Sequence, residues 1–479
     1  MEECTITFLP GNKTIRLPRG STILKAANLA GVQINAICGG EGICGRCKVI
    51  IESGECTSAD TPFLTKEEVE MGYCLACLTL VEGDMLIRIP VETKVVKGKI
   101  LTGISENNET IEVGGFELTP RTKKLFLELE PPTLNDNISD FDRLNRELKK
   151  NNFPNSTCNL PILKKLGNVI RKKSGKITVT ILETDCVQEI IDLEPGHSTK
   201  RHFGLAIDIG TTSIVVYLVD LLNGKIVDVA SDYNPQIQCG ADIISRIIFS
   251  MQKDGLDTLH NLVIKTINDL IIKLLKTRNI SQKLVDSMVV AGNTTMTHLF
   301  LGLDPRHIRE EPYIPMVTHV PLLKAKDIGI SINKNAYVYC IPSVSSYIGG
   351  DITSGVLASQ LYKKKELTMF IDIGTNGEII LGNSEWMVGA SCSAGPAFEG
   401  GGIKFGMRAV DGAIEGIVIN PDTHDPIYST IGGLKPKGIC GSGIIDAVAE
   451  LFIKGVINQK GKIQKDIKTN RIRENDGHM

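Results

Sequence analysis

Apolar residues near the N-terminus follow the spacings of strands and of one helix. The segments "TITF" and "TIRL" flank the turn "PGNK", and Ser21 is a candidate cap for a helix that ends before Gly31. Farther along the chain, "KVII" and "MLIRIP" have the composition of strands. Two strands, a helix and further strands in this order predict a small β-grasp domain over residues 1–92.

Two longer apolar strands carry nearly the same sequence. The segments "FGLAIDIGTTSIVVYLVD" and "LTMFIDIGTNGEIILGN" place Asp208 and Asp372 at the end of an apolar strand, before a glycine turn and a second strand. A repeated hairpin predicts a duplicated domain with two facing lobes. We expect the first lobe over residues 201–365 and the second over residues 366–479.

Two amphipathic helices are predicted in the first lobe, in "GADIISRIIFSM" and "LVIKTINDLIIKLL". Each has apolar residues at the spacing of one helical face, which we expect to be buried. The two faces are Ile244, Ile247, Ile248 and Met251 in the first helix, and Val263, Ile267, Leu270, Ile271 and Leu274 in the second.

The region between the N-terminal domain and the lobes has two parts. Residues 93–115 mix short apolar and polar runs and are predicted to be a linker. Residues 116–200 contain the strands "KKLFLELE" and "KITVTILE" around the amphipathic helix "DFDRLNRELKK". We expect a small α/β middle domain there. It serves packing or docking, since no catalytic spacing occurs in it.

Length and charge narrow the function classes. A chain of 479 residues is long enough for several domains. A formal net charge of −2 offers no basic surface, which argues against nucleic acid or an anionic membrane as partners. The N-terminus lacks a signal-peptide pattern, and no apolar run has the length of a membrane span. We expect a soluble, cytoplasmic protein.

Cysteines cluster at the N-terminal end. Seven of the 13 lie within the first 77 residues, and three of these fall in "CGGEGICGRC". In a reducing compartment, such clustering favours a metal centre over disulfides. The spacing C-x5-C-x2-C is one residue longer in its first gap than the C-x4-C-x2-C of plant-type [2Fe–2S] proteins. Glycines suit such a loop because it needs positive φ and N–H groups directed at sulfur.

This loop resembles the wider [2Fe–2S] ferredoxin family. In that family the final ligand lies in a segment like "LAC", which here ends at Cys77, so Cys74 would be a spare thiol. A structural zinc site with Cys74 and Cys77 as a second knuckle is the alternative. The ligands that the resemblance implies are Cys38, Cys44, Cys47 and Cys77.

The repeated hairpin has the chemistry of a phosphate-binding turn. Glycine allows backbone N–H groups to approach an anion, and hydroxyl or amide side chains add donors. Asp208 and Asp372 are the candidate catalytic residues, placed to hold Mg²⁺ through water or to orient an attacking water. Neither turn is a Walker A loop. The candidate phosphate-binding residues are Gly210, Thr211, Thr212, Gly374, Thr375 and Asn376.

These paired turns resemble the phosphate-1 and phosphate-2 loops of the actin/Hsp70/sugar-kinase ATPase superfamily. In "VAGNTTMTHLF", Asn293 either binds phosphate at a helix N-terminus or only caps that helix. In "GICGSGIIDAVAELF", Gly441 and Gly443 either admit a nucleotide or form a tight turn. Gly349–Gly350 and Glu399 are expected near the cleft between the lobes.

Taken together, the motifs resemble the reductive activators of corrinoid proteins. The resemblance rests on "CGGEGICGRC", "YNPQIQCGADIISRI", "VAGNTTMTHLFLGLDP", "DIGTNGEIILGN" and "SAGPAFEGGGI", and it covers essentially the whole chain. It implies a [2Fe–2S] domain, a linker, a middle domain and an actin-like (ribonuclease H-like) ATPase core. It also implies ATP-dependent reduction of Co(II) corrinoid to Co(I). The partners would be a corrinoid protein and a low-potential electron donor, and a homodimer is left open.

One departure from the family pattern concerns the second lobe. The second lobe, at residues 366–479, is shorter than the first lobe, at residues 201–365. The family's late glycine-rich adenosine motif is also absent. We expect an incomplete second lobe, which leaves the use of ATP and Mg²⁺ open. A [2Fe–2S] electron-transfer protein on a non-hydrolysing actin-like scaffold is the alternative function. The cysteine cluster argues against a third reading, a sugar or acid kinase.

Overall fold

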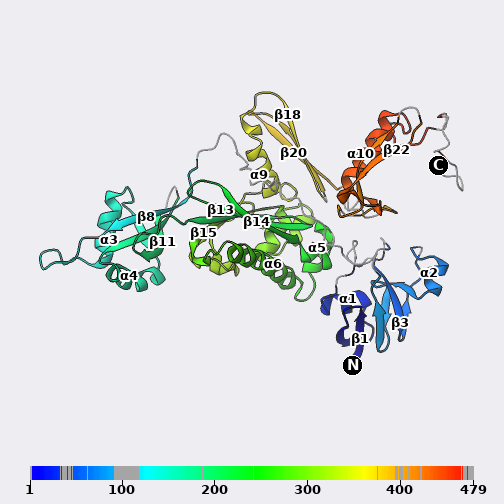
Figure 1. Ribbon diagram of the computed structural model, residues 1–479, viewed down its shortest axis with the longest axis horizontal. Helices are drawn as coiled ribbons and strands as arrows, with labels where there is room; N and C mark the ends of the chain where they lie inside the picture. The colour runs from blue at the N-terminus through cyan, green and yellow to red at the C-terminus, as the bar shows by residue number, and fades with distance from the viewer. Residues whose placement is uncertain are drawn as a thin grey trace.

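The computed structural model describes residues 3–32, 34, 40, 42, 45, 47–61, 63–90, 118–184, 188–240, 242–374, 376–393, 398, 403–407, 409–420, 423–464, 467 and 472. Figure 1 shows four groups of sheets and helices that follow one another along the chain. Among these residues no helix combines the length and the apolar composition needed to cross a membrane.

The N-terminal group is a five-stranded sheet in the order β2-β1-β7-β3-β5, with a separate β4-β6 pair. Thr22, not the predicted Ser21, caps α1, because its hydroxyl accepts a hydrogen bond from the Lys25 N–H. The elements are β1 (Glu3–Leu9), β2 (Lys13–Pro18), α1 (Ile23–Leu29), β3 (Lys48–Ser53), β4 (Cys56–Ser58), α2 (Lys66–Glu70), β5 (Tyr73–Leu75), β6 (Thr79–Val81) and β7 (Met85–Arg88). This arrangement agrees with the predicted β-grasp domain.

The second group is a four-stranded sheet in the order β8-β10-β11-β9, with two helices whose apolar residues share one core with it. Its elements are β8 (Thr122–Glu128), α3 (Asp140–Lys150), β9 (Ser156–Cys158), α4 (Leu160–Lys172), β10 (Lys176–Glu183) and β11 (Gln188–Pro195). Ser139 and Asn159 cap the two helices with their side-chain oxygens.

A buried ionic cluster fastens this second group to the first lobe. The Lys124 ammonium, 2% exposed, lies 2.8 Å from the Glu194 carboxylate and 4.0 Å from the fully buried Asp286 carboxylate of the lobe. His202 lies 3.6 Å from Asp286. Burial raises the pKa of Asp286 to about 7 and, as the larger cause, lowers that of His202 to about 4.

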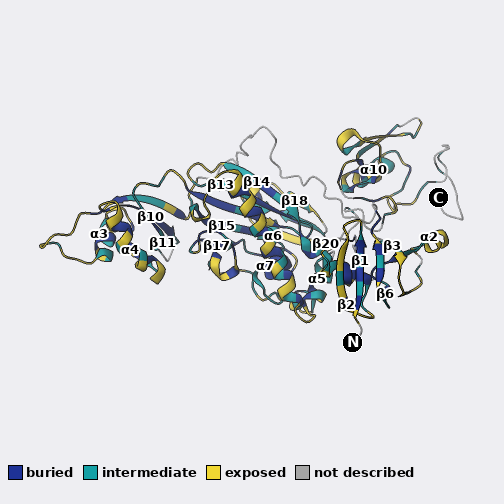
Figure 2. Ribbon diagram, turned by 60° about the horizontal axis from the view of Figure 1, so that its bottom comes forward, coloured by how far each residue is buried: buried dark blue, intermediate teal, exposed yellow. Residues whose placement is uncertain are grey.

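The first lobe has a six-stranded sheet in the order β14-β13-β12-β15-β17-β16. The three strands β12, β13 and β14 are antiparallel, and β15 and β17 continue the sheet parallel to β12. The strands are β12 (Phe203–Ile209), β13 (Ser213–Asp220), β14 (Ile226–Tyr233), β15 (Val285–Gly292), β16 (Leu323–Lys324) and β17 (Tyr337–Cys340). Figure 2 shows buried residues concentrated in this central sheet.

Helices cover the first-lobe sheet, and α6 packs against β13, β14 and α7. The helices are α5 (Ile243–Ser250), α6 (Gly255–Thr277), α7 (Thr294–Leu301), α8 (Arg306–Arg309) and α9 (Gly350–Ala358). Short 3-10 turns are η2 (Pro235–Gln238), η3 (Gln282–Leu284), η4 (Ala325–Ile328) and η5 (Leu361–Lys363). The predicted apolar face of α6 is buried in full.

The predicted face of α5 is wrong. Ile247 is buried, but Ile244, Ile248 and Met251 are 41%, 39% and 44% exposed. The helix instead buries Arg246 completely. Polar contacts explain this burial, since the Arg246 guanidinium donates to the main-chain carbonyl groups of Thr211 and Gly240.

The second lobe contains two three-stranded sheets, β18-β19-β20 and β22-β21-β23. The first repeats the antiparallel order of β12, β13 and β14. One face of β18 is open, because Met369, Ile371 and Ile373 are 56%, 51% and 60% exposed. The elements are β18 (Thr368–Ile373), β19 (Asn376–Gly382), β20 (Met387–Ser393), β21 (Ala413–Ile419), β22 (Pro426–Thr430), η7 (Ile431–Gly433), β23 (Gly438–Ile439) and α10 (Gly441–Ile453).

Candidate functional site

Two of the predicted cluster ligands face each other in the N-terminal domain. Cys47 directly precedes β3, and Cys77 lies in the turn after β5, with 3.2 Å between their sulfur atoms. This separation exceeds the ~2.05 Å of a disulfide bond. The turn is fixed because the Ala76 N–H donates to the Cys47 carbonyl (2.9 Å) and the Leu24 N–H of α1 donates to the Ala76 carbonyl (2.8 Å).

Glycines bring the cysteine loop onto this pair. Gly40, Gly42 and Gly45 have positive φ angles of 104°, 76° and 63°. A Cβ atom on Gly40 would lie 3.9 Å from that of Cys77, and one on Gly42 would lie 2.7 Å from the Leu78 side chain. Cys38 and Cys44 lie outside the described residues. Glycine backbone close to two paired thiols is compatible with a [2Fe–2S] cluster site, which needs four cysteine ligands.

Cys74 has the properties of a structural thiol. It is buried on β5, and burial raises its pKa to about 12. Its neighbour Thr79 forms a hydrogen bond with it. Cys77, in contrast, places its sulfur 3.2 Å from that of Cys47, so the geometry favours Cys77 over Cys74 as the fourth ligand.

Four carboxyl groups form a second centre, at the ends of the repeated strands. Asp208 and Asp372 are the next-to-last residues of β12 and β18, and Glu378 lies opposite Asp372 on β19. Asp351 lies in the first turn of α9. Asp351 and Glu378 were not among the residues singled out from the sequence.

These carboxyl groups interact electrostatically. Burial, followed by the charges of Asp351 and Asp372, raises the pKa of Asp208 to about 6. Burial is also the main cause for Asp351, whose pKa is about 6, for Glu378, whose pKa is about 7, and for Asp372, whose pKa is raised. Like charges held together in this way favour a cation or a proton among them.

The spacing of the carboxyl groups bears on how a cation could be held. Among the described residues, no three His, Cys, Asp or Glu side chains are close enough to ligate one ion directly. Water can reach the Asp208 residue, while the protein atoms around its carboxyl group partly desolvate that group. A Mg²⁺ ion at this centre would therefore be held through water molecules, which is usual for this ion.

The main-chain carbonyl groups of the turn after Asp208 accept hydrogen bonds from Asn234 and Arg246. The Asn234 amide donates to the Gly210 carbonyl (2.9 Å), the Arg246 guanidinium to the Thr211 carbonyl (2.5 Å), and the Asn234 N–H to the Thr212 carbonyl (2.8 Å). In a planar trans peptide the N–H points opposite to the C=O. The N–H groups of Thr211 and Thr212 therefore face away from η2, in the orientation of an anion-binding turn.

Asn293 joins this turn to the start of α7. Its side-chain oxygen accepts from the Met296 N–H (2.9 Å), which caps the helix, and its amide nitrogen donates to the Thr211 hydroxyl (3.2 Å). The start of α9 lies against the same point. A Cβ atom on Gly349 would be 2.4 Å from the Asn293 Cα. This close approach brings Asp351 to the centre, and the pair Gly349–Gly350 is the sequence signal for it.

The remaining predicted site residues belong to the second lobe. The Gly374 N–H donates to the Asn376 carbonyl (2.9 Å) and closes the second turn. Thr375 and Glu399 lie outside the described residues. A Cβ atom on Gly441 would be 2.4 Å from the Phe398 carbonyl oxygen, and one on Gly443 would be 2.3 Å from that of Ile414. Close packing therefore accounts for both glycines, whether or not a nucleotide lies beside them.

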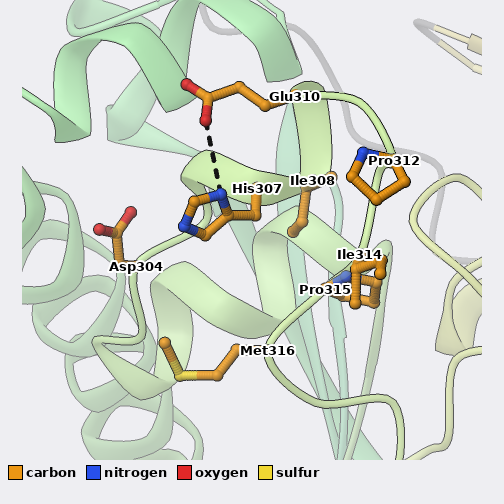
Figure 3. Close-up of a pocket in the computed structure, with 8 residues that line it drawn as sticks. All are labelled: Asp304, His307, Ile308, Glu310, Pro312, Ile314, Pro315 and Met316. Carbon is orange, nitrogen blue, oxygen red and sulfur yellow. Dashed lines mark ion pairs between the residues drawn. The ribbon is translucent and has the colours of Figure 1, made fainter.

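A separate cavity of about 370 Å³ lies on the first lobe, at α8 and the loop after it. Figure 3 shows Ile308, Pro312, Ile314 and Met316 around it, with an ion pair of 3.4 Å between His307 and Glu310. None of the four carboxyl groups lines this cavity. It is therefore distinct from the centre built by the repeated turns.

Models of protein families match nearly the whole chain. They are the 2Fe–2S iron–sulfur cluster binding domain (residues 6–82), the RACo linker region (112–200), the RACo middle region (203–364) and the C-terminal ASKHA domain of RACo (366–479). The corrinoid activation enzyme RamQ of Eubacterium limosum is 32% identical over 91% of this chain and 68% of its own length. The chain belongs to the family of reductive activators of corrinoid proteins.

Two further matches support the same family assignment. A solved structure of a reductive activator for corrinoid, iron–sulfur protein is 41% identical, with a TM-score of 0.66 over 99% of this chain and 76% of that one. The [Co(II) methylated amine-specific corrinoid protein] reductase of Methanosarcina barkeri is 26% identical over 54% of this chain, and the match spans about half of that relative's length (53%). The family, the multidomain fold and the [2Fe–2S] domain predicted from the sequence are thus confirmed. The division at residues 92, 115, 200 and 365 stays a prediction.

Proposed function

We propose that this chain reductively activates a corrinoid protein by passing one electron to its cobalt, which takes Co(II) to Co(I). The observation that carries this proposal is the presence, in one member of the activator family, of the paired Cys47 and Cys77 thiols and of a carboxylate centre beside an anion-binding turn. The first is suited to electron transfer and the second to a nucleotide.

At the cysteine loop, the residues of the chain would bind a cluster and shield it from water. A [2Fe–2S] cluster bound there supplies one electron at a potential of roughly −400 mV for the plant type. Cys38, Cys44, Cys47 and Cys77 would be its ligands. The buried environment of Cys47 and Cys77 excludes water from that side. A low-potential donor is needed, since each ~59 mV of uphill gap costs a factor of ten for one electron.

At the lobes, we propose that ATP binds with Mg²⁺. Asp208 and Asp372 hold the ion through water, and Asp351 and Glu378 add negative charge that favours it. The N–H groups of Thr211 and Thr212 donate hydrogen bonds to a phosphate group, with Asn293 beside them. Gly374, Thr375 and Asn376 form the matching turn of the other lobe. Gly441 and Gly443 allow the start of α10 to come close to the nucleotide. We expect a cytoplasmic location, because the clustered cysteines suit a metal centre in a reducing compartment, and a homodimer stays open.

The test uses the full chain carrying its cluster, under anaerobic conditions. A Co(II) corrinoid protein and a chemical reductant are added with and without MgATP, and formation of Co(I) is followed by absorption. We expect MgATP to accelerate it in the parent, and the acceleration to be lost in Asp372→Asn. Co(I) formation that is indifferent to nucleotide would support the electron-transfer alternative. No Co(I) from protein with an intact cluster would refute the proposal.

A further inference from the structure

We infer that η2 (Pro235–Gln238) is the docking surface of the iron–sulfur domain on the first lobe, and that nucleotide at the adjacent turn releases the domain from it. The inference rests on the proposed nucleotide site and adds the part of the chain that responds to it. It is carried by contacts on the two sides of η2.

On the outer side, the iron–sulfur domain touches η2 through α1. The Asn28 side-chain amide donates to the Gln238 carbonyl at 3.2 Å. Asn28 is half-buried in the last turn of α1. Figures 1 and 2 both place this domain beside α5 of the lobe. One helical turn before Asn28, Leu24 is bonded to the turn that carries Cys77, so α1 connects the docking contact to the cluster ligands.

On the inner side, η2 is held by the turn proposed to bind phosphate. Asn234 and Arg246 are both fully buried. Asn234 caps η2 by accepting from the Gln236 N–H (3.1 Å), and Arg246 donates to the Gln236 side chain (3.2 Å) and to the Gly240 carbonyl (2.9 Å). The same two residues bind the carbonyls of Gly210, Thr211 and Thr212.

These contacts make one short path from the turn to the domain. A phosphate that binds the N–H groups of Thr211 and Thr212 moves planar peptide groups, and their carbonyl ends move with them. Asn234 and Arg246 are held by those carbonyls and hold η2 in turn. In this structure the Asn28 amide is bonded to the Gln238 carbonyl. Movement of the turn toward a phosphate draws η2 away from Asn28 and frees the iron–sulfur domain.

Binding and release must then be linked reciprocally. If nucleotide weakens the docking contact, loss of that contact strengthens nucleotide binding by the same factor. One hydrogen bond of ordinary strength corresponds to about a twofold to tenfold change in an equilibrium constant. The sign is unusual for a variant that only removes a contact, because it predicts tighter binding.

The test compares the full chain with its cluster, Asn28→Ala and the control Lys25→Ala. Lys25 is exposed on the same helix. MgATP affinity is measured by calorimetry, and hydrogen exchange is measured for residues 23–29 and 235–238 with and without MgATP. Cluster absorption confirms that the variant domain is folded. We expect Asn28→Ala to bind MgATP about twofold to tenfold more tightly than the parent, with Lys25→Ala unchanged. Nucleotide should speed exchange in both segments of the parent.

Two outcomes would overturn the inference, and they differ in what else they remove. MgATP binding of equal affinity in the parent and Asn28→Ala, with unchanged exchange at residues 23–29, refutes the docking link alone. The proposed nucleotide site survives that result. Absence of MgATP binding to the parent refutes the nucleotide site and the inference with it.

Discussion

The close approach of α9 to α7 at Gly349 gives a quantitative prediction. Gly349 has φ −91° and ψ −173°, extended backbone that alanine adopts without strain. The whole effect of Gly349→Ala therefore comes from its added methyl group. The new Cβ atom would lie 2.4 Å from the Asn293 Cα and 2.8 Å from the Thr294 nitrogen. Both are backbone atoms, which cannot rotate aside.

The size of the effect follows from that contact. Carbon–carbon contacts are ordinarily about 3.5–4.0 Å long, so the two helix starts must separate by roughly 1 Å. Overpacking of this kind costs about 1–3 kcal/mol. Since Asp351 lies on one helix and Asn293 caps the other, the separation falls within the proposed nucleotide site. If the full cost appears in binding, Kd for MgATP rises about fivefold to 150-fold.

The assay is calorimetric titration of MgATP into the chain carrying its cluster. Gly167→Ala is the matched control, because Gly167 lies in α4 and an added Cβ atom would meet first the flexible end of Arg171, at 3.1 Å. We expect Gly167→Ala to bind as the parent does, with equal or slightly greater stability, since alanine is the better helix former. Gly349→Ala should also unfold at a lower temperature than the parent.

A Gly349→Ala variant whose Kd lies within twofold of the parent, and whose thermal unfolding is unchanged, would refute this reasoning. It would mean that α9 can shift at no cost, and that Asp351 need not stay beside Asn293 for a nucleotide to bind. A loss of binding in the Gly167→Ala control would also count against it, since that site is remote from the turn.

Three further predictions concern the other centres. Cys77→Ser should abolish the visible absorption of the cluster, whereas Cys74→Ser should retain it; the reverse result would make Cys74 the fourth ligand. Lys124→Ala should destabilise the protein by about 1–3 kcal/mol, because it removes the buried cation that Glu194 binds and leaves that carboxylate without its partner. Lys176→Ala, which removes a pair 56% and 61% exposed, should cost under about 1 kcal/mol in chemical denaturation. The pKa of Asp208, about 6 against an ordinary 3.8, means that the folded form binds more protons than the unfolded form between these values. Lowering the pH from about 7.5 to about 5 should therefore stabilise the metal-free protein and weaken MgATP binding. Thermal unfolding in EDTA that shows no gain in stability at about pH 5, or an added stabilisation by MgATP that does not shrink, would contradict this.

The sequence predicted those elements of the fold that depend on the spacing of residues close together in the chain. Strands that end in Asp208 and Asp372 were predictable, because apolar runs followed by glycine turns specify a hairpin by themselves. The apolar face of α6 was predictable for the same reason. The face of α5 was not, since a periodicity argument assigns Arg246 to solvent, and only the main-chain carbonyls of another segment explain its burial.

The candidate site divides in the same way. The cysteine spacing predicts a ligand set because the loop that carries most of it is continuous in sequence. Asp351 and Glu378 join the carboxylate centre through tertiary contacts, by the approach of Gly349 to Asn293 and by the register of β19 on β18. The first contact leaves only the glycine pair Gly349–Gly350 as a signal in the sequence, and the second leaves none. Buried polar groups such as Asn234 were invisible for the same reason.

The open face of β18 has a consequence for handling the protein. Three large aliphatic side chains, Met369, Ile371 and Ile373, remain more than half exposed on one strand. Water around such surface is released when two molecules meet, so the face should promote reversible self-association. That driving force weakens on cooling and strengthens with sulfate or phosphate salts. Concentrated samples should therefore scatter less light in the cold, and low temperature without kosmotropic salts is the condition in which to keep them.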